Sequence, residues 1–272
     1  MSGPTTSLVV TTYNWPEALA AILRSVQAQR VLPGEVLVAD DGSTEPTKRV
    51  VDGFRAGFPV PLHHVWQPDD GFRAGQIRNK AVARAAGEYV LQIDGDMVLH
   101  PEFVRDHVAA ATPGFFVGGS RVVLGPEVTR RVVAGEARIG PFTPGVRNRL
   151  NAVRAPALGR AVARVVSLRS LRSVRGCNMG YWRSDFLAVN GYDEGYVGWG
   201  REDTDLVVRF HQYGLRRRFF KLQGLAYHLH HREASRDRLG LNDELLRRAR
   251  DGRSWRCELG VAQYLDAPAQ RA

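Results

Sequence analysis

The chain has 272 residues, of which 44% are hydrophobic and 24% charged, so it can bury a substantial core and is neither disordered nor fibrous. Its two cysteines, Cys177 and Cys257, are widely separated, which excludes a disulfide framework and a cysteine zinc site and fits a reducing compartment. The formal net charge of +10 favours an anionic partner, and no stretch approaches the roughly 20 apolar residues of a membrane span.

Predicted strands and helices alternate along the first half of the chain. Pro16 suits the first turn of a helix, and Gly87 is typical of a helix end. Alternation of this kind indicates a mostly parallel sheet with helices on both faces. The predicted strands cover 7–13, 35–40, 60–66, 88–94 and 114–124, and the predicted helices cover 16–29, 45–54, 74–87 and 101–111.

Two carboxylates, Asp94 and Asp96, stand at the end of the strand predicted at 88–94. Ligands of open parallel sheets bind beyond the carboxyl ends of the strands. Side chains at i and i+2 of an extended segment point the same way, so these two would face one spot and repel each other unless a cation joins them. Mg²⁺ or Mn²⁺ is the natural candidate. The alternative is an ordinary Asp-Gly surface turn.

The strand at 35–40 also ends on acids, Asp40 and Asp41. A carboxylate in this position can accept hydrogen bonds from a nucleobase or from ribose hydroxyls, although Asp-Gly-Ser is also a common loop sequence. Neither GxGxxG nor GxxxxGK[ST] occurs, which disfavours an ordinary dinucleotide site or P-loop.

Arginine recurs steadily between Arg121 and Arg175, where Glu127 and Glu136 are the only acids. Such a segment attracts polyanions, but it is nearly free of aromatic residues, so no nucleic acid is expected. The open alternatives are a solvated surface, contact with a phosphorylated acceptor, and peripheral contact of Arg147–Arg175 with an anionic membrane. We therefore expect a cytoplasmic protein, either soluble or bound at the inner face of the cytoplasmic membrane. The sequence does not indicate its oligomeric state.

A glycine-rich stretch at 191–200 precedes a predicted helix at 201–214. Its aromatic residues are Tyr192, Tyr196 and Trp199, and we expect them to form a surface on which sugar rings stack. The acids of the helix's first turn are Glu202, Asp203 and Asp205. The helix dipole alone favours acids there, but they also suit a general base that takes a proton from an incoming hydroxyl.

Four segments together resemble the family-two glycosyltransferases of GT-A fold: SLVVTTYN, VLVADDGST, GFRAGQIRNKAVARAAGEYVLQIDGDM and GYVGWGREDTDLVVRF. The second half is similar to the galactosyltransferase-type C-terminal segment of some members, including bacterial chondroitin-polymerase-like domains. The resemblance implies an α/β, Rossmann-like GT-A fold with a mostly parallel central sheet flanked by helices and a C-terminal acceptor-side subregion. The expected parts are a nucleotide-sugar half at 1–125, an arginine-rich connection at 126–175, a catalytic half of the same domain at 176–235 and a helical tail at 236–272.

The resemblance also implies roles for individual residues. The nucleotide would contact Thr11, Tyr13 and Asp41 at the base and ribose, and Asp70 and Arg78 near the base and diphosphate. Asp96 would bind Mn²⁺ or Mg²⁺ directly, with Asp94 reaching the ribose or the metal. His228 matches a later metal ligand, although His230 and His231 stand beside it and remain alternatives.

Asp203 would be the catalytic base and Glu202 would bind acceptor or donor hydroxyls. Sugar or acceptor contacts are implied for Trp199, Asn178, Met179 and Gly200. Arg201 and Thr204 depart from the usual WGGEDDD pattern, which leaves the donor and the acceptor open.

The resemblance implies an inverting, metal-dependent transfer from a nucleotide-sugar, expected to be a UDP-sugar, to a hydroxyl of a glycan or lipid-linked acceptor. The alternatives are a retaining GT-A enzyme and a non-catalytic module that binds anionic lipid or phosphate.

Overall fold

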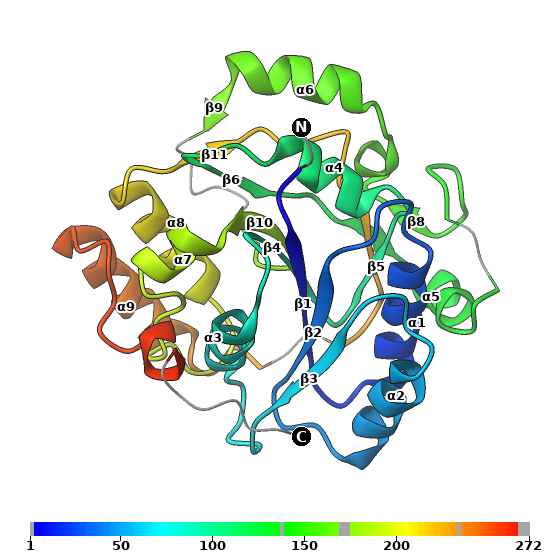
Figure 1. Cartoon of the computed structure of the whole chain (residues 1–272), viewed down its shortest axis with the longest axis horizontal. Coiled ribbons are helices and arrows are strands. Elements are labelled where there is room, and N and C mark those ends of the chain that lie inside the picture. Colours follow the sequence, from blue (N-terminus) through cyan, green and yellow to red (C-terminus); the bar gives the residue numbers. More distant parts are fainter. Residues whose placement is uncertain (1–2, 137–138, 169–174, 233–234, 266–272) are drawn as a thin grey trace.

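The computed structural model describes residues 3–136, 139–168, 175–232 and 235–265 as a central sheet with helices on both sides (Figure 1). The elements of the first half are β1 (Thr6–Thr12), α1 (Pro16–Gln27), β2 (Glu35–Asp40), α2 (Glu45–Arg55), β3 (Leu62–Trp66), α3 (Ala74–Arg84), β4 (Tyr89–Asp94), β5 (Met97–Leu99), α4 (Phe103–Ala110), β6 (Phe115–Gly118) and β7 (Val122–Leu124). Those of the second half are α5 (Pro126–Val133), β8 (Val146–Arg147), η1 (Arg149–Ala152), α6 (Pro156–Val165), β9 (Ser167–Leu168), β10 (Asn178–Trp182), α7 (Arg183–Ala188), α8 (Glu202–Gln212), β11 (Arg216–Arg218), β12 (Ala226–His228), α9 (Leu239–Gly252) and η2 (Val261–Tyr264).

The large sheet has the strand order β3-β2-β1-β4-β10-β6-β11-β9. Its first four strands are parallel neighbours, which confirms the predicted mostly parallel sheet. Strand β10 departs from that pattern, because it runs antiparallel between β4 and β6. This strand comes from the second half of the chain, so the residues around 176–178 lie beside the end of β4.

A second sheet has the order β5-β12-β7-β8. Its strand β12 pairs with β5 so that His228 lies opposite Met97. Since Met97 follows Asp96 in the chain, this pairing brings a histidine from the second half next to the predicted metal ligand.

The prediction of a single strand at 114–124 is wrong. The structure divides it into β6, which belongs to the large sheet, and β7, which belongs to the second sheet. The chain leaves the large sheet at Gly119, where a Cβ atom would lie 2.2 Å from the Asn178 amide. A run of apolar residues does not reveal such a transfer between sheets, because both strands bury similar side chains.

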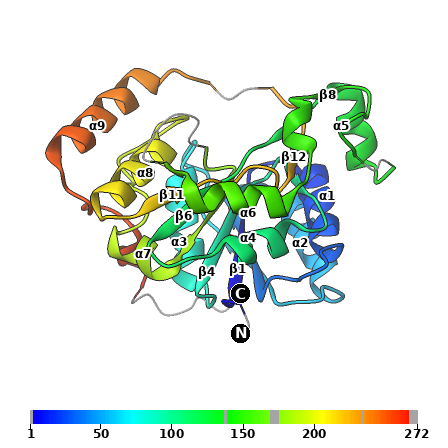
Figure 2. The same cartoon turned by 90° about the horizontal axis from the view of Figure 1, so that it is seen from above.

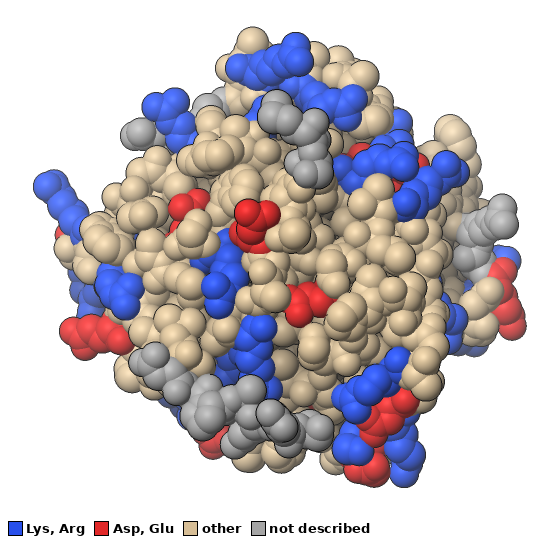
Figure 3. Space-filling model, in the orientation of Figure 1, with Lys and Arg blue, Asp and Glu red and all other residues tan. Residues whose placement is uncertain are grey.

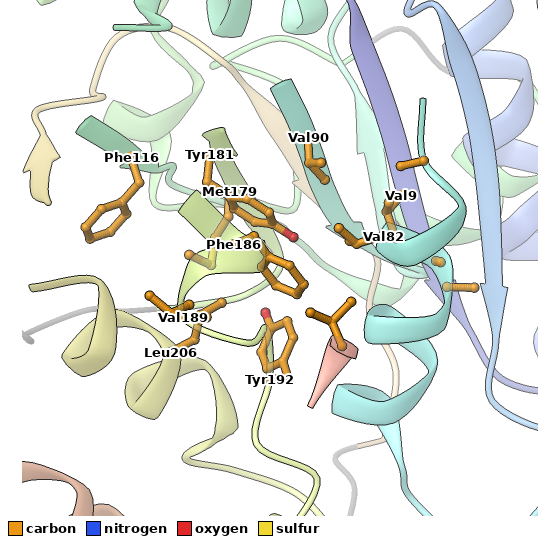
Figure 4. Close-up of a cluster of buried hydrophobic side chains, with 14 of the residues drawn as sticks. Val9, Val82, Val90, Phe116, Met179, Tyr181, Phe186, Val189, Tyr192 and Leu206 are labelled. Atoms are coloured by element: carbon orange, nitrogen blue, oxygen red, sulfur yellow. The ribbon is translucent and has the colours of Figure 1, made fainter. Parts of the chain in front are cut away.

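Apolar side chains pack against both faces of the large sheet. Alternate residues of β1 point to opposite faces, as expected for a strand: Leu8 and Val10 face α1, and Val9 faces α3. Figure 4 shows the cluster of buried side chains on the α3 side of the sheet, in which Val9 and Val82 lie near Tyr181 and Phe186. The C-terminal part also reaches it, since Val261 of η2 is fully buried there.

Several helices of the second half lie at the outside of the molecule. Helix α9 is at the periphery in both views, and α6 crosses the front in Figure 2. Across the described ranges, no helix combines the length and the apolar character that a membrane crossing requires.

Helix α3 ends at Arg84, before the glycine that was predicted to close it. Position 87 instead requires glycine because the chain passes close to the start of β1 and leaves no room for a side chain. A Cβ atom at position 87 would lie 2.5 Å from the backbone nitrogen of Ser7.

Gly87→Ala is therefore expected to lower the free energy of unfolding by about 1–3 kcal/mol, as overpacking generally does. Gly53→Ala in α2 is the matched control, since a Cβ atom there meets nothing within 4 Å. It should raise the free energy of unfolding by about 0.5–1 kcal/mol through the better helix propensity of alanine. Urea unfolding followed by circular dichroism measures both values, and equal effects of the two substitutions would contradict the close packing at Gly87.

Candidate active site

The polar ends of the parallel strands meet at one edge of the large sheet. Thr11 lies opposite Asp94, and Thr12 lies opposite Asp40. Gly95 allows the chain to pass directly over the end of β1, because a Cβ atom there would lie 2.4 Å from the Thr11 carbonyl oxygen. The strand ends therefore form one continuous polar floor, at the edge where ligands of such sheets bind.

Arg78 of α3 is the centre of this floor and is only 3% exposed. Its Nε donates to Thr11 Oγ1 at 3.1 Å, its Nη2 to Asp94 Oδ1 at 2.7 Å and its Nη1 to Asp203 Oδ1 at 3.2 Å. The same Nη1 lies 3.5 Å from Glu202 Oε1. One guanidinium thus joins α3, β1, β4 and α8. Since these protein groups use it, the predicted contact of Arg78 with a diphosphate stays a prediction.

Asp203 is held by three donors. Besides Arg78, the Gly176 N–H donates to Oδ2 at 2.7 Å and the Tyr192 hydroxyl lies 3.1 Å from Oδ1. A carboxylate has about four acceptor sites, so one remains for a further donor. The side chain is 21% exposed, which makes that site accessible.

The Tyr192 hydroxyl is oriented by a buried polar network. Gln92 Nε2 donates to it at 2.8 Å, and Gln92 Oε1 accepts from Tyr181 at 3.0 Å. The Tyr192 hydroxyl lies 3.1 Å from two acceptors, Gln92 Oε1 and Asp203 Oδ1, so it bridges the buried glutamine and Asp203. Figure 4 shows Tyr181 and Tyr192 packed with Phe186, so the network is enclosed by apolar rings.

Glu202 differs from its neighbour in being nearly inaccessible. Its side chain is buried, and its Oε2 atom has no hydrogen-bond partner within the described part of the chain. Burial, together with the charge of Asp203, raises the pKa of Glu202 to about 8. Burial likewise raises the pKa of Asp94 to about 6, although Arg78 opposes it. The raised pKa of Glu202 favours its protonated form at pH 7, and Asp203 is the more exposed of the two side chains.

His228 and His231 bring two imidazoles to Asp96. Asp96 Oδ2 lies 3.1 Å from His228 Nε2 and 2.8 Å from His231 Nε2. One ligand atom from each residue lies within 4.8 Å of the others. His230, the third candidate, is exposed and contributes its backbone N–H to Thr129.

This group fits a divalent cation. Asp96 Oδ1 and His228 Nδ1 are buried atoms for which the described residues provide no partner. A carboxylate with two imidazoles suits Mn²⁺ better than Mg²⁺, which prefers oxygen ligands. Burial alone would raise the pKa of the Asp96 carboxyl, but the hydrogen bonds from the two histidines lower it below its usual range. Among the protein groups, Arg78 lies against Asp94, and the two histidines lie against Asp96.

The predicted nucleotide contacts lie around the end of β2. Asp41 is buried, with Oδ1 accepting from Gln67 Nε2 at 2.6 Å and Oδ2 accepting from the Arg73 N–H at 2.8 Å. Burial raises its pKa to about 6, although these hydrogen bonds oppose the rise. Tyr13 is 52% exposed and donates to Asp69. Asp70 is exposed and pairs with Arg73, so it does not join the group around Arg78.

The predicted sugar contacts fall into two groups. Trp199 is 39% exposed, with the Arg236 guanidinium 5.0 Å from its ring centroid, and it can still offer a ring to a sugar. Gly200 forms a turn with φ of 102°, and its carbonyl accepts from Asn242. The expectation of an aromatic surface is wrong for Tyr192 and Tyr196, which are both buried.

The predicted sugar contacts of Asn178 and Met179 are contradicted by their positions in β10. Asn178 is fully buried: its Oδ1 lies 3.0 Å from His107 Nε2, and its amide donates to the carbonyls of Ser120 and Gly224. Met179 is in the core of Figure 4. Both side chains are buried, so neither offers exposed surface to a sugar. Asn178 instead links β10 to the segments that precede β7 and β12.

Comparison with protein families identifies the chain. The model of "Glycosyl transferase family 2" matches residues 7–172. The chain belongs to glycosyl transferase family 2. A second model, described as the N-terminal domain of galactosyltransferase, matches residues 161–232. The family resemblance expected from the sequence motifs is thus confirmed.

Named relatives agree with this family. The validoxylamine A glucosyltransferase of Streptomyces hygroscopicus subsp. limoneus is 28% identical over 244 residues, which is 78% of this chain and 49% of that protein. The chondroitin synthase of Escherichia coli is 24% identical over 82% of this chain and 34% of its own length. The chain therefore spans half or less of the length of these relatives.

Solved structures show the same fold. Residues 1–349 of S. aureus TarS in complex with UDP match with a TM-score of 0.62 and 18% identity, over 96% of this chain and 68% of that one. The mannosyltransferase PcManGT of Pyrobaculum calidifontis, in complex with GDP-Man and Mn²⁺, matches with a TM-score of 0.56 and 18% identity. The match covers 84% of this chain and 58% of PcManGT. The predicted GT-A architecture is confirmed by these neighbours.

Three residues of this family 2 glycosyltransferase site were missed by sequence reasoning. Gly176 and Tyr192 hold Asp203, and Gln92 orients Tyr192. The one available signal was Gln92, a polar residue in the middle of an otherwise apolar strand. Such a residue must find a partner when it is buried.

Glu202→Gln tests the electrostatics of this glycosyltransferase site. A pKa raised to about 8 in the folded protein means that Glu202 contributes stability fully present below its unfolded pKa and lost as the pH rises through about 8. Glutamine does not ionise, so the variant does not lose this stability as the pH rises. Between about pH 5 and pH 8, the free energy of unfolding of the variant should therefore increase relative to that of the wild type by roughly 1–3 kcal/mol. Urea unfolding at both pH values measures the difference.

The control is Glu17→Gln, which removes an exposed carboxylate of α1. Its difference from the wild type should not change with pH. If the Glu202 variant behaves like this control, the described burial of Glu202 is incorrect.

Proposed function

We propose that this domain transfers a sugar from a UDP-sugar to a hydroxyl of a glycan or lipid-linked acceptor with inversion, and that Asp203 is the general base. The observation that carries the proposal is the convergence around Arg78. This arginine binds Asp94, which is two residues from Asp96, and also binds Asp203, which lies over a hundred positions later. A donor held at Asp96 would therefore present its sugar next to Asp203.

The divalent ion of this proposal is Mn²⁺, held by Asp96, His228 and His231. When bound there, it would supply Lewis-acid stabilisation of the departing nucleoside diphosphate. His231 extends the sequence prediction, and its distance of 2.8 Å from Asp96 Oδ2 supports its inclusion.

Asp203 is better suited than Glu202 to accept a proton from the acceptor hydroxyl. Its side chain is 21% exposed against 9% for Glu202, so an acceptor can reach it. Gly176, Tyr192 and Arg78 fix its orientation and leave one acceptor site open. Glu202, which is largely protonated at neutral pH because burial raises its pKa to about 8, would donate a hydrogen bond to a sugar hydroxyl instead.

The nucleotide base would bind beside Asp41 and Tyr13. Each Asp41 oxygen accepts one hydrogen bond from the described residues, so each keeps acceptor capacity for an imide N–H or a ribose hydroxyl. Half of the Tyr13 side chain is exposed and can stack on a base. The structural neighbours include complexes with UDP and with GDP-Man, and we propose UDP because TarS matches with the higher TM-score.

Asp203→Asn should lower the rate of sugar transfer by roughly 100-fold or more, which is the range that general base catalysis supplies. Affinity for UDP with Mn²⁺ should change by less than about threefold, because Asp203 faces the acceptor side. Transfer is measured with a panel of UDP-sugars, and binding by calorimetry. Asp237→Asn, which changes an exposed aspartate, is the control. Wild-type turnover of the Asp203 variant would remove this residue from its proposed role.

The product's anomeric configuration separates the alternatives. A β-linkage from an α-linked donor supports inversion, and an α-linkage would assign a retaining mechanism, for which a base at Asp203 has no use. A non-catalytic module would give neither transfer nor slow donor hydrolysis with any sugar nucleotide.

Replacement of single histidines tests the metal site. His228→Ala and His231→Ala should each weaken Mn²⁺ binding in the presence of UDP by at least roughly tenfold, since each removes one protein ligand. Electron paramagnetic resonance of free Mn²⁺ measures this affinity. His230→Ala is the matched control, because its exposed side chain is outside the group, and it should leave the affinity unchanged. Equal effects of all three substitutions would contradict the assignment.

A further inference from the structure

Helix α6 presents an apolar row to solvent. Leu158 is 57% exposed and Val165 is 83% exposed, and Ala161 between them is exposed as well. These positions are three and four residues apart, so they lie on one face of the helix. Gly159 is the sole buried residue of α6. An amphipathic helix normally turns its leucine and valine side chains towards the core, so this row is available to a partner.

The same segment exposes further large apolar side chains. Phe142 is 85% exposed and Leu150 is 84% exposed. Leu150 and Val153 also line a cavity of about 370 Å³ whose other walls include residues 221–225. Residues 139–166 thus expose several large apolar side chains, and exposed apolar patches mark interaction sites.

The charge of the segment is entirely positive. Residues 139–166 contain five arginines and neither lysine nor acidic residues. Arg160 and Arg164 are exposed and four residues apart, so they lie together beside the apolar row. Figure 3 shows basic side chains over α6 at the upper edge of the molecule. Arg138, Arg169 and Arg172, which belong to the same arginine-rich stretch, are outside the described residues.

The segment is fixed to the body of the protein and lies near the proposed metal site. Arg154 donates to both oxygens of the buried Asp106, at 3.0 and 2.6 Å. Arg147 and His228 both lie opposite Val123, one on each side of β7. Two strand spacings separate their Cα atoms by about 10 Å.

We propose that residues 139–166 form a docking surface for an anionic phospholipid bilayer. The apolar side chains of α6 and η1 would enter the interface, and the arginines would contact lipid phosphates. Charge complementarity supports this occupant, and the exposed leucine, valine and phenylalanine side chains distinguish it from a purely electrostatic partner. Docking would also hold the site beside an acceptor at the bilayer; this consequence rests on the proposed function, whereas binding itself does not.

Vesicle flotation with the full chain tests the proposal without any assay of activity. The wild type should float with phosphatidylcholine vesicles that contain phosphatidylglycerol, and should stay unbound with phosphatidylcholine alone. Arg160→Ala with Arg164→Ala should weaken partitioning roughly 30-fold, as expected for two arginines at a charged surface. Leu158→Ser with Val165→Ser, which keeps every charge, should weaken it roughly tenfold or more through lost apolar insertion.

The matched control removes two exposed helical arginines elsewhere, by Arg49→Ala in α2 and Arg250→Ala in α9. It should float like the wild type, and all variants should melt at the same temperature as the wild type. Flotation that falls equally in the control and in the α6 arginine variant would overturn the proposal. A second result would also overturn it: the wild type does not float, and instead forms a dimer that dissociates when Leu158 and Val165 are replaced. The surface would then bind a second copy of the chain.

Discussion

One buried guanidinium, that of Arg78, holds together the acidic groups on which the site depends. Asp94 and Asp203 lie within a low-dielectric region where uncompensated carboxylates would repel one another. Leaving a buried charge without its partner costs about 3–5 kcal/mol, so these groups and the arginine form a single unit. The same contacts fix the separation of β4 from α8. The carboxylate proposed as the base is therefore held at a constant distance from the strand that leads to Asp96, the proposed metal ligand.

The topology explains how residues far apart in the sequence reach this arginine. Strand β10 inserts antiparallel next to β4 and places Gly176, whose N–H holds Asp203, at the polar edge of the sheet. The second sheet does the same for the histidines, because β12 pairs with β5 immediately after Asp96. The second half of the chain thus contributes two strands, β10 and β12, which pair with the first-half strands β4 and β5 on either side of Gly95 and Asp96. Neither half contains the complete group of acids, imidazoles and arginine.

Much of the fold and of the acidic site could be predicted from the sequence, because both follow from local patterns. The alternation of apolar runs predicts the parallel strands, and the polar strand ends predict that Asp41, Asp94 and Asp96 lie at one edge of the sheet, where the structure has them. Spacing could not show which polar residues are buried. Asn178 and Tyr192 look like surface groups in the sequence, but β10 and the following loop enclose them. Likewise, the sequence could not show that the side chain of His231, rather than that of His230, lies beside Asp96.

A crystal structure with Mn²⁺ and UDP would test the central claim most directly, because it records the metal ligands and the Arg78 contacts in one measurement. The account predicts Mn²⁺ bonded to Asp96, His228 and His231, with Arg78 still bridging Asp94 and Asp203. A metal-bound diphosphate located away from these three ligands, or an Arg78 side chain that no longer contacts Asp203, would contradict it.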